Sequence, residues 1–205
     1  MSFIVTSDGN ELNMLSPQPG HITASSIAHS LAQINRFNGH ARRPYSVAEH
    51  SLLVCEIAER EHGLCIHGQF AALMHDAHEA YCGDVATPAK PAIGCGWLKW
   101  ERHWEKIVQC SFSILVPSYV NRAAIKAADL AALATERRDL MPATPTPWAV
   151  LDGIEPIGWV DLMDKGRCAM EWSDWRAAFL DKHDELDFGR NLLMQRMAVR
   201  NGAPA

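Results

Sequence analysis

Residues 71–90, AALMHDAHEAYCGDVATPAK, place an adjacent His75–Asp76 pair directly after an apolar run and follow it with Glu79. The apolar run, residues 70–74, has the length and composition of a buried helix. Side chains four positions apart share one helix face, so we expect His75 and Glu79 to project together, with Asp76 beside them. The stretch therefore predicts ionisable groups set against an apolar core.

Burying ionisable groups in this way is unfavourable unless something compensates their charge. A divalent metal ion would do so, because neutral imidazole and carboxylate are both good metal ligands. The alternative is a surface helix that happens to be rich in His and Asp. Within this stretch alone both interpretations stay open, since one His-Asp dipeptide is a weak signal.

Further ligands are needed to close a metal site, and two other segments offer them. Ser46 and Glu49 form a capping box, which predicts the start of a helix that carries His50 in its first turns. Residues 125–133 predict an apolar helix with a single carboxylate, Asp129, which needs a partner if it is buried. Three predicted helices thus each supply potential metal ligands.

The order of these residues resembles the HD superfamily of metal-dependent phosphohydrolases. It is most similar to the bacterial 5′-deoxynucleotidases and to the related phage dATP triphosphohydrolases. Five segments agree in order and spacing over roughly residues 27 to 133, and any one alone would be unspecific. The matching segments are 34–37 (INRF), 46–51 (SVAEHS), 75–79 (HDAHE), 83–90 (GDVATPAK) and 126–129 (KAAD).

The resemblance implies an all-α fold, an HD-domain helical bundle, and it assigns roles to individual residues. The implied metal ligands are His50, His75, Asp76 and Asp129. The implied catalytic residues, Glu79 and Asp84, stay off the metal and position water or move protons.

The implied substrate-binding residues are Arg36, Phe37, Thr87 and Lys90. Arg36 would grip phosphate through its planar fork, and Phe37 would lie against the base or sugar. Without a metal site, the simpler interpretations are an exposed Arg36, a core Phe37 and a surface Lys90.

The implied function is metal-dependent hydrolysis of the 5′ phosphoester of a deoxynucleotide. We expect dATP to be cleaved to deoxyadenosine and triphosphate, with phosphate release from deoxynucleoside monophosphates as the alternative. Two arginines in the loop 39–45, Arg42 and Arg43, would leave room for the longer anion. A lower-ranked alternative is a nucleotide-binding regulator without catalysis, which the complete ligand set disfavours. A helical adaptor with coincidental His and Asp would bind no metal. The implied cofactor is a divalent metal, Zn or Co first, with Mn, Mg or Fe also suitable.

Composition is consistent with a cytoplasmic enzyme, of a bacterium or of a phage acting in its host. The chain has 205 residues, 48% hydrophobic and 21% charged, which is ordinary for one globular domain. A net charge of −5 argues against a broad nucleic-acid surface but not against a small anionic substrate. Six cysteines show no CxxC pairing, and neither a membrane-spanning run nor a secretory leader is evident.

The whole chain, residues 1–205, is expected to form one domain. Residues 3–13 predict a small β-hairpin around Asp8-Gly9. The core would span about 21–140, with a first helix from Ser25 or Ser26 to about residue 39.

A tryptophan-bearing helix would begin at Gly96 and end at Pro117, and a following helix, about 119–139, would close with the solvated charges of residues 136–139. Residues 141–160 predict a loop and 161–200 predict further helices, before a frayed end. The tryptophan stripe suggests a homo-oligomer, a dimer or a dimer-based hexamer.

Overall fold

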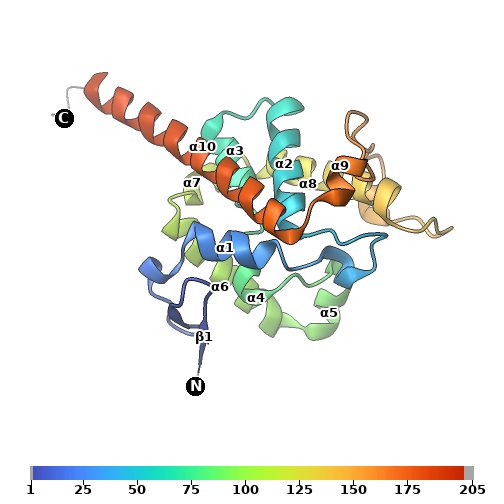
Figure 1. The fold of residues 1–205 in the computed structure, drawn as a ribbon, viewed down its shortest axis with the longest axis horizontal. Coiled ribbons are helices and arrows are strands. Elements are labelled where there is room, and N and C mark those ends of the chain that lie inside the picture. The colour runs from blue at the N-terminus through green and yellow to red at the C-terminus, as the bar shows by residue number, and fades with distance from the viewer. Residues whose placement is uncertain (1, 201–205) are drawn as a thin grey trace.

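The computed structural model describes residues 2–200, which form an all-α fold with one small antiparallel hairpin (Figure 1). This confirms the expected fold class. The α-helices are α1 (Ala24–Leu31), α2 (Val47–Arg60), α3 (Ile66–Leu73), α4 (Glu79–Cys82), α5 (Lys90–Ile93), α6 (Cys95–Ser111), α7 (Leu115–Val120), α8 (Arg122–Leu140), α9 (Lys165–Ala169) and α10 (Trp172–Arg200). Short 3-10 turns are η1 (Pro19–His21), η2 (Arg36–Gly39), η3 (Thr87–Ala89) and η4 (Ala149–Leu151).

The hairpin pairs β1 (Phe3–Val5) with β2 (Glu11–Asn13), as the sequence predicts. Gly9 takes a positive φ of 79° in the connecting turn, a conformation that a side chain would disfavour. Leu12 is the one strand residue that is buried, so a single side chain anchors the hairpin to the helices.

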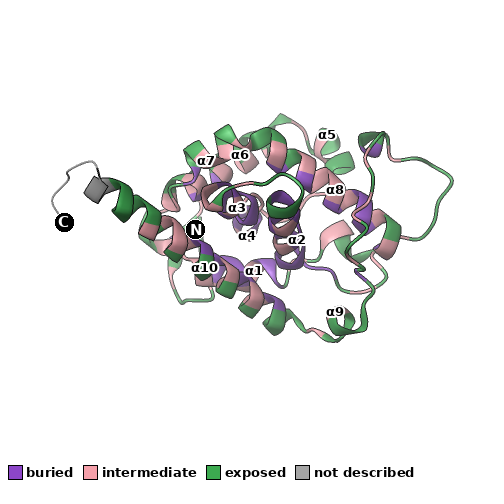
Figure 2. Ribbon diagram, turned by 90° about the horizontal axis from the view of Figure 1, so that it is seen from above, coloured by how far each residue is buried: buried purple, intermediate pink, exposed green. Residues whose placement is uncertain are grey.

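Helix α2 is the central element, and buried residues run along it on nearly every side (Figure 2). Ser46 caps its start by accepting a hydrogen bond from the Glu49 backbone N–H at 3.1 Å. Helices α3, α8 and α10 pack around it. The first turns of α2 are buried on every side, so this helix holds His50 in the interior with none of its surface exposed.

The first predicted helix is shorter than expected. Helix α1 begins after its N-cap, Thr23, and ends at Leu31, so Arg36 and Phe37 do not lie on its last turn. Phe37 and Asn38 lie in the separate 3-10 turn η2, where they adopt positive φ values of 56° and 51°. Backbone bonds from Arg36 N–H to Tyr45 and from residue 47 to residue 34 instead pair this segment with the start of α2.

The predicted helix through His75 and Glu79 is also wrong in its form. Helix α3 ends at Leu73, residues 74–78 are turns, and Glu79 begins the separate helix α4. The His75 ring helps to end α3, because its Nδ1 lies 2.8 Å from the Ala72 carbonyl oxygen and competes for that acceptor. His75 and Asp76 thus lie in a turn between two helices.

The tryptophan-bearing helix, α6, ends at Ser111, and Pro117 lies inside the next helix, α7. Trp104 is fully buried and stacks on Tyr81 of α4, with ring centroids 4.8 Å apart. Trp97 and Trp100 are only half-buried. Much of the apolar surface of these tryptophans is therefore buried within one chain, and homo-oligomerisation remains a prediction.

The C-terminal part crosses the bundle. Residues 141–160 are irregular apart from η4, as expected, and α9 is short. The single long helix α10 replaces the two predicted helices and runs diagonally across α1, α2 and α3 (Figure 1). The predicted frayed end, residues 201–205, lies outside the described residues. No helix in the described part of the chain has the length and hydropathy needed to cross a membrane.

We expect Trp104→Ala to lower the free energy of unfolding by about 3–5 kcal/mol, because it removes a fully buried indole and leaves a cavity. Trp172→Ala is the matched control, since Trp172 is 45% exposed and should cost much less. Urea denaturation of the metal-free protein measures both changes. Equal losses in the two variants would contradict the packing described for α6.

Candidate functional site

Four side chains converge where α2, α8 and the turn after α3 meet. His50 Nε2 lies 3.3 Å from His75 Nε2, 3.5 Å from Asp76 Oδ2 and 3.4 Å from Asp129 Oδ1. His75 Nε2 lies 3.1 Å from the same Asp76 oxygen. We call these four residues the His/Asp cluster. The sequence placed them on three separate segments, and the structure brings them together.

Each histidine of the cluster has its second ring nitrogen occupied. His50 Nδ1 lies 2.6 Å from Glu136 Oε1, and His75 Nδ1 lies 2.8 Å from the Ala72 carbonyl. Carboxylate and carbonyl oxygens only accept hydrogen bonds, so both Nδ1 atoms carry the proton. In the neutral rings both Nε2 atoms therefore present a lone pair to the centre of the cluster.

A second carboxylate network supports the cluster from behind. Arg36 donates from its Nη2 atom to Glu136 Oε2 at 3.2 Å, and its Nη1 lies 3.7 Å from Asp76 Oδ2. Glu136 is fully buried, and the Arg36 side chain is only 12% exposed. Arg36 thus connects the partner of His50 to a cluster carboxylate.

The pKa values show how strongly these groups interact. Burial and the Arg36 charge lower the pKa of His50, but Glu136 and Asp129 outweigh them and raise it to about 9. Burial raises the pKa of Asp129, yet the hydrogen bond and charge of His50 hold it well below its usual range. Asp76 is likewise held low, against burial, chiefly by His75. The metal-free cluster is therefore held together by charge attraction between imidazolium and carboxylates.

The two flanking carboxyl groups behave in the opposite way. Burial, with Asp76 and Asp84 close by, raises the pKa of Glu79 well above its usual range. Burial also raises the pKa of Asp84, although Arg36 opposes it. Glu79 Oε2 is buried without a hydrogen-bond partner among the described residues. A carboxyl group in that condition is suited to hold a proton or a water molecule.

The cluster fits a divalent metal ion. Its donor atoms lie 3.1–3.5 Å apart, and ligands bound at about 2.0–2.2 Å to one ion are separated by about 3.0–3.5 Å. His50, His75 and Asp76 offer ligand atoms that all lie within 4.8 Å of one another. Both Nδ1 partners orient their rings as the partners of metal-bound histidines do. These three residues can therefore hold a metal ion. Asp129 is not one of the three, but its Oδ1 lies 3.4 Å from His50 Nε2, at the edge of the group.

A pocket of about 580 Å³ opens onto this cluster. His75, Asp76 and Asp129 line its inner end, beside Glu79. Its other walls come from the start of α5 and from α6, α7 and α8, and they carry Lys90, Leu98, Glu101, Arg102, Glu105, Gln109, Leu115, Ser118, Tyr119, Arg122, Ile125 and Lys126. Solvent and small molecules would thus reach a metal ion at the cluster through this pocket, whose walls carry both acidic and basic side chains.

The predicted substrate-binding residues are divided between this pocket and the surroundings of the cluster. Lys90 lines the pocket, and its ammonium donates to Glu101 at 2.6 Å. Phe37 packs against Trp148 with ring centroids 6.2 Å apart, and Thr87 is exposed; neither they nor Arg36 line the pocket. The predicted phosphate-binding role of Arg36 stays a prediction. In this structure its guanidinium contacts Glu136 and lies near Asp76 of the cluster.

The expectation that Arg43 is free to contact an anionic substrate is wrong. Arg43 forms a two-pronged pair with buried Glu49, at 2.8 and 2.7 Å, and also donates to the Leu162 carbonyl. Arg167 of α9 contacts the same carboxylate at 3.0 Å. Arg43 therefore ties residues 162–167 to α2, and of the two loop arginines only Arg42 stays exposed.

Two residues of the site were missed from the sequence. Glu136 was expected at a solvated helix end, yet it is fully buried. Its position seven residues after Asp129, two turns along one face, was the available signal. His78, which the sequence did not single out as a site residue, is 8% exposed and lines the pocket. The turn at residues 74–78 brings it there, which a continuous helix would not do.

The fold and the site define an all-α protein with a buried His/Asp group that can hold a metal ion. No protein-family model matches the chain. The chain is 38% identical over 154 residues, 75% of its length and 81% of the relative's, to the uncharacterized protein YfdR of Escherichia coli (strain K12). It belongs to the same family as YfdR.

A second relative is similar over a shorter region. The uncharacterized protein RCAP_rcc00048 of Rhodobacter capsulatus is 42% identical over 126 residues, which are 59% of this chain and 64% of that protein. Neither relative's name states an activity.

We expect Glu136→Gln to weaken metal binding about 10–100-fold, because it removes the charge that orients His50 and balances Arg36. Chelator competition with Zn²⁺ and Co²⁺ measures the affinity. Glu185→Gln is the control, since Glu185 is 65% exposed on α10. Unchanged affinity in the Glu136 variant, with the native circular dichroism spectrum, would refute this role.

The raised pKa of His50 predicts a pH dependence for the metal-free protein. Because the folded-state pKa is about 9 and an unfolded histidine has about 6.5, the protonated ring stabilises the fold fully below pH 6.5. That contribution is lost as the pH rises through 9. Thermal unfolding of chelator-treated protein between pH 6.5 and 9.5 should show the loss, and His50→Gln should flatten it. An identical slope in both proteins would contradict the expectation.

Proposed function

We propose that this protein is a metal-dependent phosphohydrolase that cleaves the 5′ phosphoester of deoxynucleotides. The observation that supports it best is the convergence of two imidazoles and two carboxylates, with oriented Nε2 atoms, at the inner end of an open pocket. A helical adaptor with coincidental His and Asp has no need for such an arrangement. The HD-superfamily resemblance of the same residues supplies the reaction class.

His50, His75, Asp76 and Asp129 would hold the ion. A divalent metal bound there polarises a phosphoryl oxygen and makes a water molecule more acidic. The protein's own contribution is to fix the four ligands. Glu136 and the Ala72 carbonyl set the two rings, and Arg36 balances the carboxylate charge around them.

Glu79 is the proposed acid–base residue. Its carboxyl group lines the pocket next to Asp76, and burial raises its pKa, which makes it a stronger proton acceptor than an ordinary carboxylate. Its unpartnered Oε2 would hold the attacking water and accept its proton. Asp84 is half-buried nearby but does not line the pocket, so its proposed role is to support Glu79.

The pocket fits an anion joined to a flat, partly apolar group. Four cationic side chains lie along it, Lys90, Arg102, Arg122 and Lys126, and Leu98, Leu115, Tyr119 and Ile125 supply apolar surface. We therefore keep dATP, cleaved to deoxyadenosine and triphosphate, as the proposed substrate. Arg43 no longer supports this choice, because Glu49 occupies it. Deoxynucleoside monophosphates are the second candidate, since the cluster with Lys90 would suffice for one phosphate group.

The remaining proposals follow from the donor set and the fold. Imidazole and carboxylate favour Zn, Co, Mn or Fe over Mg, so we propose Zn or Co as the native ion. A homo-oligomer acting in the cytoplasm is also proposed. Light scattering at micromolar concentration tests the first of these two points.

Product analysis tests the proposed function directly. Purified protein loaded with Zn, Co or Mn is incubated with a panel of deoxynucleoside mono- and triphosphates, and products are separated by ion-exchange chromatography. We expect deoxyadenosine and triphosphate from dATP. Phosphate from the monophosphates would support the second candidate. No turnover with any metal that the protein binds would refute the proposal.

We expect Glu79→Gln to slow turnover about 10²–10⁴-fold while metal content stays unchanged, because the carboxyl group moves a proton but holds no metal. Asp76→Ala is the contrasting variant and should lose metal and activity together. Metal analysis and kcat measurements on the active substrate decide between them. A Glu79→Gln enzyme with near-normal kcat would show that another group takes the proton.

A further inference from the structure

Lys126 lies one helical turn before Asp129 on α8 and contacts the same carboxylate that faces the cluster. Its Nζ donates to Asp129 Oδ2 at 2.7 Å, while Asp129 Oδ1 lies 3.4 Å from His50 Nε2. Lys126 lines the pocket together with Asp129. An ammonium group therefore lies at the edge of the metal site, although its side chain is 64% exposed.

The charges around Lys126 would change when a metal ion binds. In the metal-free cluster, Asp129 is balanced by His50 and by Lys126. A divalent ion bound to the carboxylate takes over this balance, and the Lys126 ammonium is left without a full counter-charge. Lys90 differs, because Glu101 still neutralises it at 2.6 Å. Of these two lysines, Lys126 is the one free to attract an anion.

A second cation continues the same wall. Arg122 lies four residues before Lys126, so the two share one face of α8, and both line the pocket. The Arg122 guanidinium lies 4.7 Å from the ring centre of Tyr119, which is 69% exposed. From residue 122 to 129 the helix rises about 10 Å, so the wall extends well beyond a single phosphate group.

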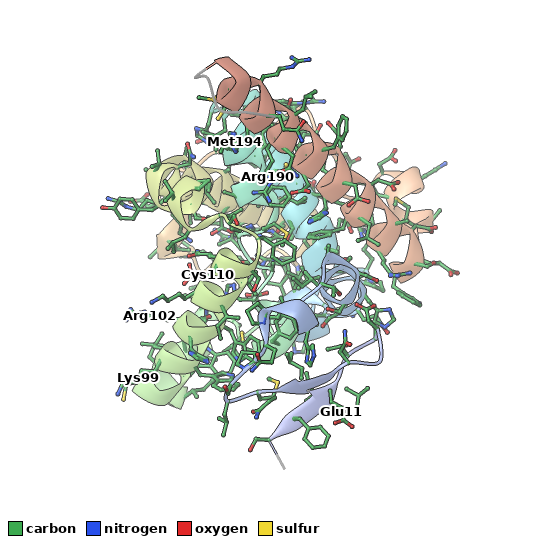
Figure 3. All side chains as sticks on the ribbon, turned by 90° about the vertical axis from the view of Figure 1, so that its left-hand side faces the viewer. Glu11, Lys99, Arg102, Cys110, Arg190 and Met194 are labelled. Atoms are coloured by element: carbon green, nitrogen blue, oxygen red, sulfur yellow. The ribbon has the colours of Figure 1, made fainter. Side chains whose placement is uncertain are left out.

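We infer that Lys126 and Arg122, the α8 cation pair, form an anion-binding lane that takes the phosphate groups beyond the one held at the cluster. The inference rests on the proposed function for its substrate, and it deepens that function by naming the residues that make this chain prefer a polyphosphate. Arg102 of α6 also lines the pocket and adds a further positive charge (Figure 3). The exposed Tyr119 ring at the outer end offers a stacking surface.

The binding of inorganic anions tests the lane without relying on turnover. Co-loaded protein is titrated calorimetrically with orthophosphate and with tripolyphosphate. Wild-type protein should bind tripolyphosphate more tightly. Lys126→Met should weaken tripolyphosphate about tenfold, the loss expected for a hydrogen bond to a charged group, and should change orthophosphate much less. Lys126→Arg should restore most of the affinity.

Two further variants make the result decisive. Lys99→Met removes the same charge from an exposed position on α6 outside the pocket, and it should leave both affinities unchanged (Figure 3). Arg122→Met does not touch Asp129, so it tests the lane even if the Lys126 variant loses metal. Equal tripolyphosphate affinity in wild type, Lys126→Met and Arg122→Met would overturn the inference, as would equal affinity of wild type for the two anions.

The same variants separate this inference from the proposed function. With an active substrate, Lys126→Met should raise KM for dATP about tenfold and leave kcat nearly unchanged. Lane-dependent tripolyphosphate binding without any turnover would preserve the lane and refute the phosphohydrolase. Hydrolysis of dATP that is indifferent to both lane variants would preserve the enzyme and refute the lane.

Discussion

The hydrogen bond between His50 Nδ1 and Glu136 Oε1 is the interaction on which the site depends. It joins α2 to α8 through two side chains that are both fully buried. Because the carboxylate can only accept, it sets the tautomer of His50 and turns Nε2 toward the other ligands. A buried carboxylate needs compensation, and Arg36 provides it from the 3-10 turn η2. One bond thus fixes the relative positions of three segments.

The carboxylates around His50 also explain why its imidazole ring is protonated in the metal-free site. Glu136 and Asp129 both lie within ion-pair distance of His50, at 2.6 and 3.4 Å. Without a metal, the site relies on a protonated His50, which is why its pKa rises to about 9. A divalent ion would replace that proton and complete the charge balance, so metal binding and proton release are linked. His50 and Glu136 are both fully buried, so their hydrogen bond is shielded from water even though the pocket opens onto the other cluster residues.

The sequence predicted the elements better than it predicted their ends. Hydrophobic periodicity and the Ser46 capping box located α2 and α8 correctly, because both helices are long and buried. It failed around His75, where the ring's bond to the Ala72 carbonyl ends α3 early, a contact that periodicity does not encode. The sequence also failed after Leu31, where α1 ends and residues 34–36 instead pair with the start of α2. The convergence of the His/Asp cluster was predictable because residue type and order match the HD pattern. The hydrogen-bond partner of His50 was not, since Glu136 looks like a surface charge until the chain folds around it.

Metal coordination is the most direct test of this account. X-ray absorption spectroscopy of the Co-loaded protein reports the number of imidazole rings bound to the ion and the distances to its ligands. The account predicts two imidazoles, with nitrogen and oxygen ligands at about 2.0–2.2 Å, and one imidazole in His50→Gln. A stably bound ion with no imidazole scattering, or a spectrum unchanged by His50→Gln, would contradict it.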